Sequence, residues 1–393
     1  MCGIVGYVGP RSAQEVLLRG LEHLEYRGYD SAGIAVVDQG EIQVSKAKGR
    51  LQNLRDRLEA HPLHGNLGIG HTRWATHGEP SDLNAHPHTD VKGDIALVHN
   101  GIIENHQRLR EFLEGQGCVF VSQTDTEVIA HLLHYLYRGD MVQALREASG
   151  MLEGSWALCV LHRGASDTLW ATRKDSPLVL GLGEGENLAA SDIPAILGHT
   201  REIALLEDKE IAEVRADGVR ILTPMGGERP VRTFHVDWDV AAAEKGGWPH
   251  FMLKEIHEEP EALQKTFTAH VDAQRMTLRQ EAFPMTAQQA QALRKMSIVA
   301  CGTAYHAGMI GKYLMERLAR LPVEAEVASE FRYRNPILGA EDLCMAVSQS
   351  GETADTLAAL REARKSGARI MALTNVVGSS MARETEGNVL FPW

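Results

Sequence analysis

The sequence has few cysteines and aromatic residues, and it contains no long hydrophobic run. Only 6% of its 393 residues are aromatic, and five are cysteines. No apolar stretch approaches the roughly 18 residues that a membrane-spanning helix needs. The N-terminus also lacks the basic start and apolar stretch of a secretory signal. These absences predict a cytoplasmic protein with no membrane partner.

The cysteines are too few and too widely spaced in the sequence to form a disulfide framework. Their number is odd, and no two of them form a C-x-x-C pair. This pattern is typical of reduced, intracellular thiols rather than of disulfides or a zinc site. His86-Pro87-His88 has no evident third ligand, so we expect a loop there and no metal. Cys159 lies in an apolar run and is expected to be a buried strand residue.

Positively charged residues are also fewer than negatively charged ones. The sequence has 40 Lys and Arg residues and 52 Asp and Glu residues, which gives a net charge of −12. Binding to nucleic acid or to anionic membranes needs clustered positive charge, so we expect neither. The 44% apolar and 23% charged residues are those of an ordinary globular protein. The length predicts two or three domains.

The first 235 residues have the pattern of one α+β unit. Short β-rich runs alternate with glycine and with helical segments, which predicts stacked sheets with flanking helices. One helix is expected between Pro10 and Gly28. A second is expected from a capping box at Thr124–Glu127 to about Arg138. The expected strands are Ile4–Val8, Ala32–Val37, Ile95–His99 and Trp156–Leu161.

The pattern changes after residue 235. Residues 236–260 include glycine and proline and are predicted to be a linker or hinge. From 261 to 393, continuous apolar strands alternate with helices, which predicts a doubly wound parallel sheet. The expected strands are Ser297–Ala300, Leu343–Val347 and Ile370–Leu373, and the expected helices run from about Ala304 to Leu318 and from Thr353 to Lys365.

Cys2 is the first candidate catalytic residue. Removal of Met1 would place a thiol and a free α-amine on one residue. The α-amine titrates at about 7.7–8.0 and can therefore accept the thiol proton. A cysteine at position 2 is also compatible with an inert residue, so the rest of the chain must decide.

Three polar positions suggest what such a nucleophile would act on. Asn100 and the N–H of Gly101 could together bind an oxyanion. Arg73 could hold a carboxylate through its planar fork, and Asp125, at a helix start, could accept an ammonium. Each also has an ordinary structural explanation as a turn, a surface arginine or a cap. Together they describe a free amino acid with a reactive side chain.

The combination resembles the class II, N-terminal-nucleophile glutamine amidotransferases. The motifs that carry this resemblance are Cys2-Gly3-Ile4, Tyr26–Gly33, His71–Pro80, Asn100-Gly101 and Thr124–Glu127. Two later motifs, Cys301–His306 and Ser348–Thr353, resemble a sugar-isomerase module. Together the resemblances cover essentially the whole chain. They imply a four-layer αββα sandwich followed by a sugar-isomerase subdomain.

The resemblance also implies roles for individual residues. Cys2 would be the nucleophile and its α-amine the base, with Asn100 and Gly101 as the oxyanion hole. Trp74 would lie on a loop that closes over glutamine and gates ammonia, although a surface-loop aromatic is the plainer interpretation. Arg27 would support the nucleophile. The implied glutamine-binding residues are Arg73, Trp74, Thr76, His77, Gly101 and Asp125.

A sugar-phosphate site is expected where two strands of the second unit end. Ser348–Thr353 follows an apolar strand and opens a helix, where N–H groups, hydroxyls and the helix dipole favour a phosphate. A serine-rich helix cap is the alternative. Gly302-Thr303 at the neighbouring strand end favours a ligand at this sheet edge. The candidate residues are Gly302, Thr303, Ser348, Gln349, Ser350 and Thr353.

Members that combine these modules hydrolyse L-glutamine through a cysteine thioester and deliver ammonia to fructose 6-phosphate, forming glucosamine 6-phosphate. The resemblance thus implies this activity through Cys2, no cofactor, and a homodimer in the full-length form. Two departures matter. Ala304 replaces the usual serine, and the family continues beyond the position of Trp393 into a second subdomain and tail. From this we expect a truncated chain that retains glutaminase activity and partial sugar-phosphate binding. The alternatives are another phosphosugar acceptor or a non-catalytic sugar-phosphate sensor.

Overall fold

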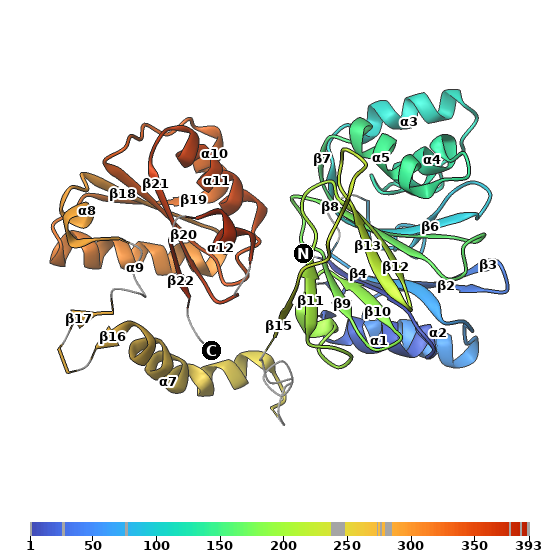
Figure 1. Ribbon diagram of the computed structural model, residues 1–393, viewed down its shortest axis with the longest axis horizontal. Helices are drawn as coiled ribbons and strands as arrows, with labels where there is room; N and C mark the ends of the chain where they lie inside the picture. Colours follow the sequence, from blue (N-terminus) through green and yellow to red (C-terminus); the bar gives the residue numbers. More distant parts are fainter. Residues whose placement is uncertain are drawn as a thin grey trace. The chain divides into compact units, whose positions relative to one another are not determined.

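The computed structural model describes residues 2–25, 28–74, 78–236, 248–272, 274–275, 277–279, 285–376, 379–385 and 387–390. The chain divides into two compact units, Met1–Gly246 and Gly247–Trp393 (Figure 1). Each unit has its own sheets and cores and is described by itself. Within the described residues, no helix has both the length and the apolar character needed to cross a bilayer.

Two antiparallel sheets form the centre of the first unit. The eight-stranded sheet has the order β15-β11-β9-β10-β1-β4-β2-β3. Its strands are β1 (Gly3–Val8), β2 (Ser31–Asp38), β3 (Glu41–Lys48), β4 (Leu67–Arg73), β9 (Val179–Leu182), β10 (Asn187–Ala190), β11 (Glu202–Leu205) and β15 (Thr233–His235). The seven-stranded sheet has the order β14-β13-β12-β8-β7-β6-β5. Its strands are β5 (His88–Thr89), β6 (Ile95–Ile103), β7 (Gly154–His162), β8 (Leu169–Lys174), β12 (Ile211–Arg215), β13 (Gly218–Leu222) and β14 (Glu228–Arg229).

Helices cover the outer face of each sheet (Figure 1). Those on the eight-stranded sheet are α1 (Ala13–Glu22) and α2 (Leu51–Ala60), with the short 3-10 helix η2 (Ile193–Ala195) beside α1. Those on the seven-stranded sheet are α3 (His106–Gly115), α4 (Glu127–Leu136) and α5 (Met141–Met151). The result is the predicted four-layer αββα sandwich.

The central strand β1 shows why this sequence forms such layers. Ile4 and Val8 belong to the core between the two sheets, whereas Val5 and Tyr7 belong to the core beneath α1 and α2. Side chains alternate between the faces of a strand, so one strand serves two cores. Each such burial contributes about 1.5–3 kcal/mol, and a one-residue slip would exchange the two faces.

Helix α1 is shorter than the sequence predicts. Ser12 caps it by accepting a hydrogen bond from the Glu15 N–H at 3.5 Å, and the helix ends at Glu22 rather than just before Gly28. Gly28 lies against β4, where a Cβ atom would be 2.6 Å from the carbonyl carbon of Arg73. The chain must therefore leave the helix early to run beside this strand.

The second unit is built on a parallel five-stranded sheet of order β19-β18-β20-β21-β22. Its strands are β18 (Lys295–Ala300), β19 (Val323–Val327), β20 (Asp342–Val347), β21 (Arg369–Thr374) and β22 (Gly387–Leu390). Its helices are α7 (Phe251–His270), α8 (Ala287–Gln291), α9 (Gly302–Leu318), α10 (Ala328–Tyr333), α11 (Ala354–Lys365) and α12 (Ser380–Glu384). A two-stranded sheet, β16 (Val271–Asp272) and β17 (Thr277–Leu278), follows α7.

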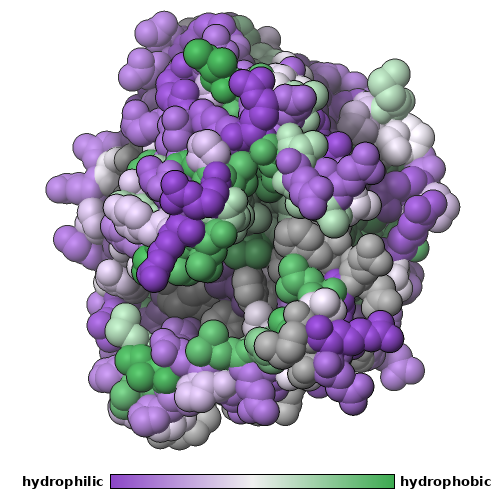
Figure 2. Space-filling model, turned by 90° about the vertical axis from the view of Figure 1, so that its left-hand side faces the viewer, coloured by the Kyte–Doolittle hydropathy of each residue, from purple (hydrophilic) through white to green (hydrophobic). Residues whose placement is uncertain are grey.

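Both faces of the parallel sheet carry a core. Leu357 and Leu360 of α11 pack with Val299 and Ala346 on one face. Met315 of α9 packs on the core of the other face. Helices on both faces of a parallel sheet make the doubly wound arrangement that the sequence predicts. Helices α7 and α9 expose apolar side chains, among them Leu263, Phe267, Ile310 and Leu314. Apolar residues lie among polar ones on the face drawn in Figure 2.

The predicted linker overlaps a helix. Residues 237–247 lie outside the described residues, but α7 already begins at Phe251 and continues through Pro260. Two ion pairs support this helix, Lys254–Glu258 and Lys265–Glu261, and the partners in each pair lie one helical turn apart. The proline and glycine in this segment are typical of a linker, but the segment overlaps the start of a 20-residue helix.

Candidate functional site

Cys2 lies at the start of β1, which is paired on both sides. The register of β1 with β4 places Gly3 opposite Thr72, so Cys2 meets the end of β4. The N–H of Trp74 donates to the Cys2 Sγ at 3.2 Å, and the thiol lies 3.6 Å from the Trp74 carbonyl oxygen, to which it donates. The backbone after β4 therefore fixes the position of the sulfur.

The sulfur is held in its protonated form. Burial raises the pKa of the Cys2 thiol, and the hydrogen bond from the Trp74 N–H opposes this only in part. The thiolate, not the thiol, is the nucleophile, so attack by this cysteine needs a base to take its proton.

Asn100 and Gly101 reach the same place from β6. The Asn100 Nδ2 donates to the Cys2 carbonyl oxygen at 2.9 Å. Gly101 has φ of +136°, and a Cβ atom there would lie 2.1 Å from the Ser155 carbonyl oxygen. This position therefore requires glycine. The structure brings the two predicted oxyanion donors beside Cys2.

Arg73 and Asp125 supply opposite charges at the site, although both are buried. Their exposed fractions are 4% and 5%. Arg73 Nη2 donates to the Gly78 carbonyl oxygen at 3.1 Å, and Asp125 Oδ2 accepts the Ile103 N–H at 2.8 Å. Hydrogen bonds of this kind orient charged groups that would otherwise be costly to bury.

These residues line one pocket that encloses about 300 Å³, part of it open to solvent. Its lining residues are Cys2, Arg73, Trp74, His86, His99, Gly101, Thr124, Asp125 and Thr126. The sequence motifs thus converge on one pocket that holds a thiol, a guanidinium and a carboxylate. Three of the residues assigned from the sequence, Arg27, Thr76 and His77, lie outside the described residues.

Trp74 stands at the outer side of this pocket. Its side chain is 48% exposed and meets the 51%-exposed Tyr29 edge to face, with ring centroids 5.4 Å apart. This exposed position is compatible with closure over a bound ligand. Gating by Trp74 stays a prediction.

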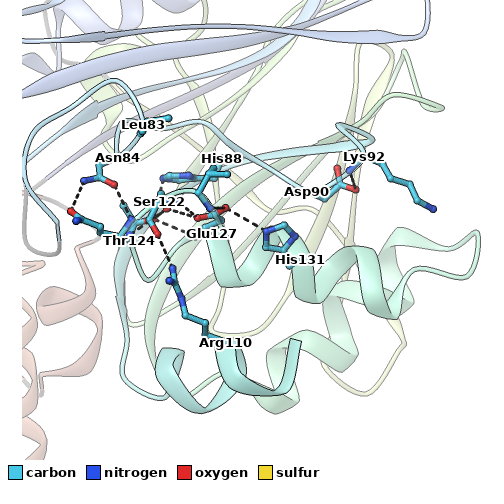
Figure 3. A network of polar contacts seen from close by, with 12 residues as sticks. Leu83, Asn84, His88, Asp90, Lys92, Arg110, Ser122, Thr124, Glu127 and His131 are labelled. Atoms are coloured by element: carbon cyan, nitrogen blue, oxygen red, sulfur yellow. Dashed lines mark hydrogen bonds and ion pairs between the residues drawn. The ribbon is translucent and has the colours of Figure 1, made fainter. Parts of the chain in front are cut away.

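The loop that carries Asp125 is shaped by Glu127, a residue of α4 (Figure 3). The Glu127 carboxylate accepts the N–H of Val121 at 2.8 Å, and the N–H and hydroxyl of Ser122 at 2.6 Å each. His131 Nε2 lies 3.4 Å away. These partners offset the effect of burial and lower the pKa of Glu127 to about 2. The expected capping box is half formed, since the Glu127 N–H donates to the Thr124 hydroxyl at 3.4 Å.

Two further contacts tie this loop to its surroundings (Figure 3). Asn84 accepts the Gln123 N–H at 2.9 Å and donates to the Gln123 side-chain oxygen at 3.2 Å. The Thr124 hydroxyl lies 3.1 Å from the His88 Nε2. The loop is therefore held from both sides, which fixes the N-terminus of α4 next to the pocket.

Sequence reasoning did not assign roles to the buried histidines of the site. His71, His86 and His99 are at most 5% exposed, and burial lowers the pKa of each. The signal was present, because His71 and His99 stand within otherwise apolar or glycine-rich strands. A histidine there is buried, neutral and available as a hydrogen-bond donor.

One group of residues within the described ranges has ligand atoms spaced as a metal ion would need. It comprises Asp90, Asp94 and His134, whose atoms lie within 4.8 Å of one another. The Asp90 carboxylate already accepts the Ile95 N–H at 2.8 Å and pairs with His134 at 2.7 Å. None of the three lines the Cys2 pocket.

The candidate sugar-phosphate residues lie at one edge of the parallel sheet. Ala300 of β18 is in register with Val347 of β20, so the segments that follow these strands are neighbours. Gly302 and Thr303 open α9 and are exposed. Ser348–Thr353 leads into α11. Two helix N-termini therefore start from adjacent strand ends.

The hydroxyls of this segment also hold its own turn. Ser348 Oγ accepts the Gly351 N–H at 3.1 Å and lies 3.1 Å from the Thr353 hydroxyl. Ser350 Oγ accepts the Glu352 N–H at 3.2 Å, while Gln349 is exposed. Thr353 is the N-cap of α11 but makes no side-chain cap hydrogen bond. The geometry suits both a phosphate cradle and a preformed turn.

The two units match two known domain families. Residues 71–198 match the glutamine amidotransferase domain, and residues 291–391 match the SIS domain. The B. subtilis glutamine phosphoribosylpyrophosphate amidotransferase is a solved structure with a TM-score of 0.53 at 19% identity. This likeness covers 95% of the present chain and 81% of that chain, and it concerns the fold alone.

Curated relatives match the whole chain at much higher identity. Glutamine–fructose-6-phosphate aminotransferases (isomerizing) of Symbiobacterium thermophilum and Clostridium tetani are 55% and 53% identical over 393 residues. That of Thermus thermophilus is 51% identical over 388 residues. For the first two relatives, the match covers 100% of this chain and 64% of the relative. For the third, it covers 98% of this chain and 63% of the relative. The chain is therefore similar over all or nearly all of its own length to these glutamine–fructose-6-phosphate aminotransferases, and it spans somewhat less than two thirds of theirs.

Proposed function

We propose that the first unit hydrolyses L-glutamine to glutamate and ammonia through a thioester on Cys2. The observation that carries the proposal is the shared pocket of Cys2, Arg73 and Asp125, with Asn100 bonded to the Cys2 carbonyl. In it, Arg73 binds the α-carboxylate of glutamine and Asp125 binds its α-ammonium. These two contacts leave the side-chain amide to face the sulfur.

The chemistry follows from these groups. Cys2 Sγ attacks the amide carbon, and the thiol proton passes to the α-amine that Met1 removal exposes. Asn100 Nδ2 and the Gly101 N–H stabilise the oxyanion. The carbon–nitrogen bond then breaks, and the proton returns to the leaving nitrogen as ammonia departs. Water cleaves the thioester, which gives glutamate and the free thiol.

For the whole protein we propose that the ammonia reaches fructose 6-phosphate and forms glucosamine 6-phosphate. The names of the relatives and the SIS-domain match support this acceptor. Gly302, Thr303, Ser348, Gln349, Ser350 and Thr353 would hold its phosphate. The same proposal includes dimerisation of the whole protein, support of the nucleophile by Arg27, and glutamine binding by Thr76 and His77.

Glutamate release from glutamine tests the first step, and the matched variants are Cys2→Ala and Cys118→Ala. We expect release by the wild-type chain and by Cys118→Ala, and none by Cys2→Ala. Mass spectrometry of the same samples shows whether Met1 has been removed. We expect activity only in samples from which it has been removed. Full activity with Met1 attached would contradict the α-amine as base. With fructose 6-phosphate present, we expect these 393 residues to form no amino sugar. Clear glucosamine 6-phosphate formation would refute that expectation.

A further inference from the structure

His71 lies on β4 of the eight-stranded sheet and contacts Asn100 on β6 of the seven-stranded sheet. Its Nε2 lies 3.0 Å from the Asn100 Oδ1 and 3.1 Å from the His99 carbonyl oxygen. Both partners are carbonyl-type oxygens, which only accept hydrogen bonds. The hydrogen must therefore be on the His71 Nε2.

The rest of the ring agrees with this tautomer. His71 is fully buried, and burial lowers its pKa to about 3, so the ring is neutral near pH 7 and carries a single N–H. Its Nδ1 is buried and has no hydrogen-bond partner among the described residues. The ring stacks on His86, with centroids 4.1 Å apart and planes inclined by 13°. His86 is itself held, because its Nδ1 accepts the His99 N–H at 3.2 Å.

The hydrogen bond from His71 decides which way the Asn100 amide points. With Oδ1 bonded to His71, Nδ2 is directed to the Cys2 carbonyl at 2.9 Å. A flipped amide would place its NH₂ group against the His71 N–H. It would also turn Oδ1 toward the oxyanion, where two negative partial charges would repel. One buried tautomer therefore excludes the unproductive orientation.

We propose that His71 is a positioning residue for the oxyanion site: its Nε2–H fixes the Asn100 amide so that Nδ2 donates to the oxyanion formed at Cys2. This inference rests on the proposed glutamine hydrolysis. His71 touches neither substrate nor sulfur in this mechanism. Its effect passes through Asn100 alone.

Three substitutions separate the hydrogen bond from packing. His71→Phe keeps a flat ring against His86 but removes the donor. His71→Gln retains an amide N–H near the position of Nε2, and His71→Asn is a matched amide that is one methylene too short to reach. We expect His71→Phe and His71→Asn to lower kcat by about 10–100-fold, less than loss of a whole oxyanion donor, with KM within twofold. His71→Gln should recover most of this loss.

A second readout follows the oxyanion site without turnover. Glutamate γ-semialdehyde carries an aldehyde that adds to a thiol and forms a tetrahedral adduct, with no bond broken to a leaving group. Its affinity should fall in His71→Phe by the same factor as kcat, whereas the rate of Cys2 alkylation by iodoacetamide should not change. In an Asn100→Ala background, His71→Phe should have no further effect on either quantity.

The outcomes divide cleanly. Nitrogen NMR of wild-type His71 must show the Nε2–H tautomer, and an Nδ1–H tautomer overturns the proposal. Equal kcat in wild type and His71→Phe, or losses that add to that of Asn100→Ala, also overturn it. If His71→Phe does not fold, the comparison of His71→Gln with His71→Asn decides in the same way. If the wild-type chain binds the aldehyde but releases no glutamate, the proposed function fails, while the aldehyde affinities still test His71.

Discussion

The Glu127 carboxylate accepts both the backbone N–H and the hydroxyl of Ser122, each at 2.6 Å. The first acidic residue of α4 thus folds the loop in front of its own helix. Asp125 lies in that loop and lines the Cys2 pocket. Glu127, which does not line the pocket, therefore helps to place the Asp125 carboxylate, which we propose as the ammonium-binding group.

Glu127→Gln should disturb glutamine binding more than the chemical step. The amide is uncharged and presents an N–H to groups that themselves donate, so about 1.5–3 kcal/mol of stability should be lost. We expect a higher KM for glutamine and a lower Tm, measured by steady-state kinetics and thermal unfolding. Glu111→Gln, at an exposed position of α3, is the control and should match wild type in both. An unchanged KM in a destabilised Glu127→Gln chain would restrict Glu127 to a structural role.

Gly101→Ala should damage the oxyanion site through backbone geometry. The added Cβ would meet the Ser155 carbonyl at 2.1 Å, and φ of +136° disfavours any side chain. Displacement of the Gly101 N–H should lower kcat by about 10²–10³, the usual loss for one oxyanion donor. Gly115→Ala is the control, because a Cβ there meets nothing within 4 Å. Near-normal kcat in Gly101→Ala would remove this N–H from the mechanism.

Acid should destabilise the first unit below about pH 6.5, the ordinary pKa of histidine. Burial lowers the pKa of His71 to about 3, and that of His86 well below its ordinary value. As pH falls below 6.5, the unfolded chain binds protons that the native chain does not, so stability is lost. Each such histidine costs about 1.4 kcal/mol per pH unit until the native ring is protonated.

Calorimetric unfolding between pH 7.5 and 5 tests this proton linkage. His71→Phe should reduce the number of protons linked to unfolding by about one at pH 5. His61→Gln, at an exposed position, should leave it unchanged. If His71→Phe has the wild-type pH dependence, His71 is not buried as a neutral ring.

Thr353→Ala should weaken phosphate binding by the second unit if the segment before α11 is a phosphate cradle. A lost hydrogen bond to a charged oxygen costs about 1.5–3 kcal/mol, which calorimetric titration with fructose 6-phosphate and with inorganic phosphate would detect. Ser366→Ala, at the far end of the same helix, should bind like wild type. If neither ligand binds wild type and Thr353→Ala only lowers Tm, the segment is a helix cap.

Much of the fold was predictable from local pattern. The alternation that places Ile4 and Val5 on opposite faces of β1 is visible in the sequence, and so are the continuous apolar strands of the second unit. Cys2, Arg73, Asn100 and Asp125 were predicted to act together, and the structure brings them to one site.

What the sequence did not reveal depends on register between distant strands. The bond from His71 to Asn100 crosses from one sheet to the other, and no local spacing encodes it. Glu127 was expected to complete a capping box, yet its carboxylate bonds to Ser122, because the loop turns back over the helix. Helix α1 ends early for the same kind of reason, since Gly28 must lie against Arg73.

The pairing of β1 has a consequence for when the surroundings of Cys2 are completed during synthesis. Ile4, two residues after Cys2, donates its N–H to the Ser191 hydroxyl at 3.0 Å and accepts the Ser191 N–H at 3.1 Å. Ribosomes add about 5–20 residues per second, so roughly 10–40 s separate the synthesis of these two partners. During that interval β1 can pair with β4 but lacks β10, its neighbour on the other side. Although Cys2 is among the first residues made, the pairing of the strand that follows it is completed only when the chain has been synthesised past residue 191.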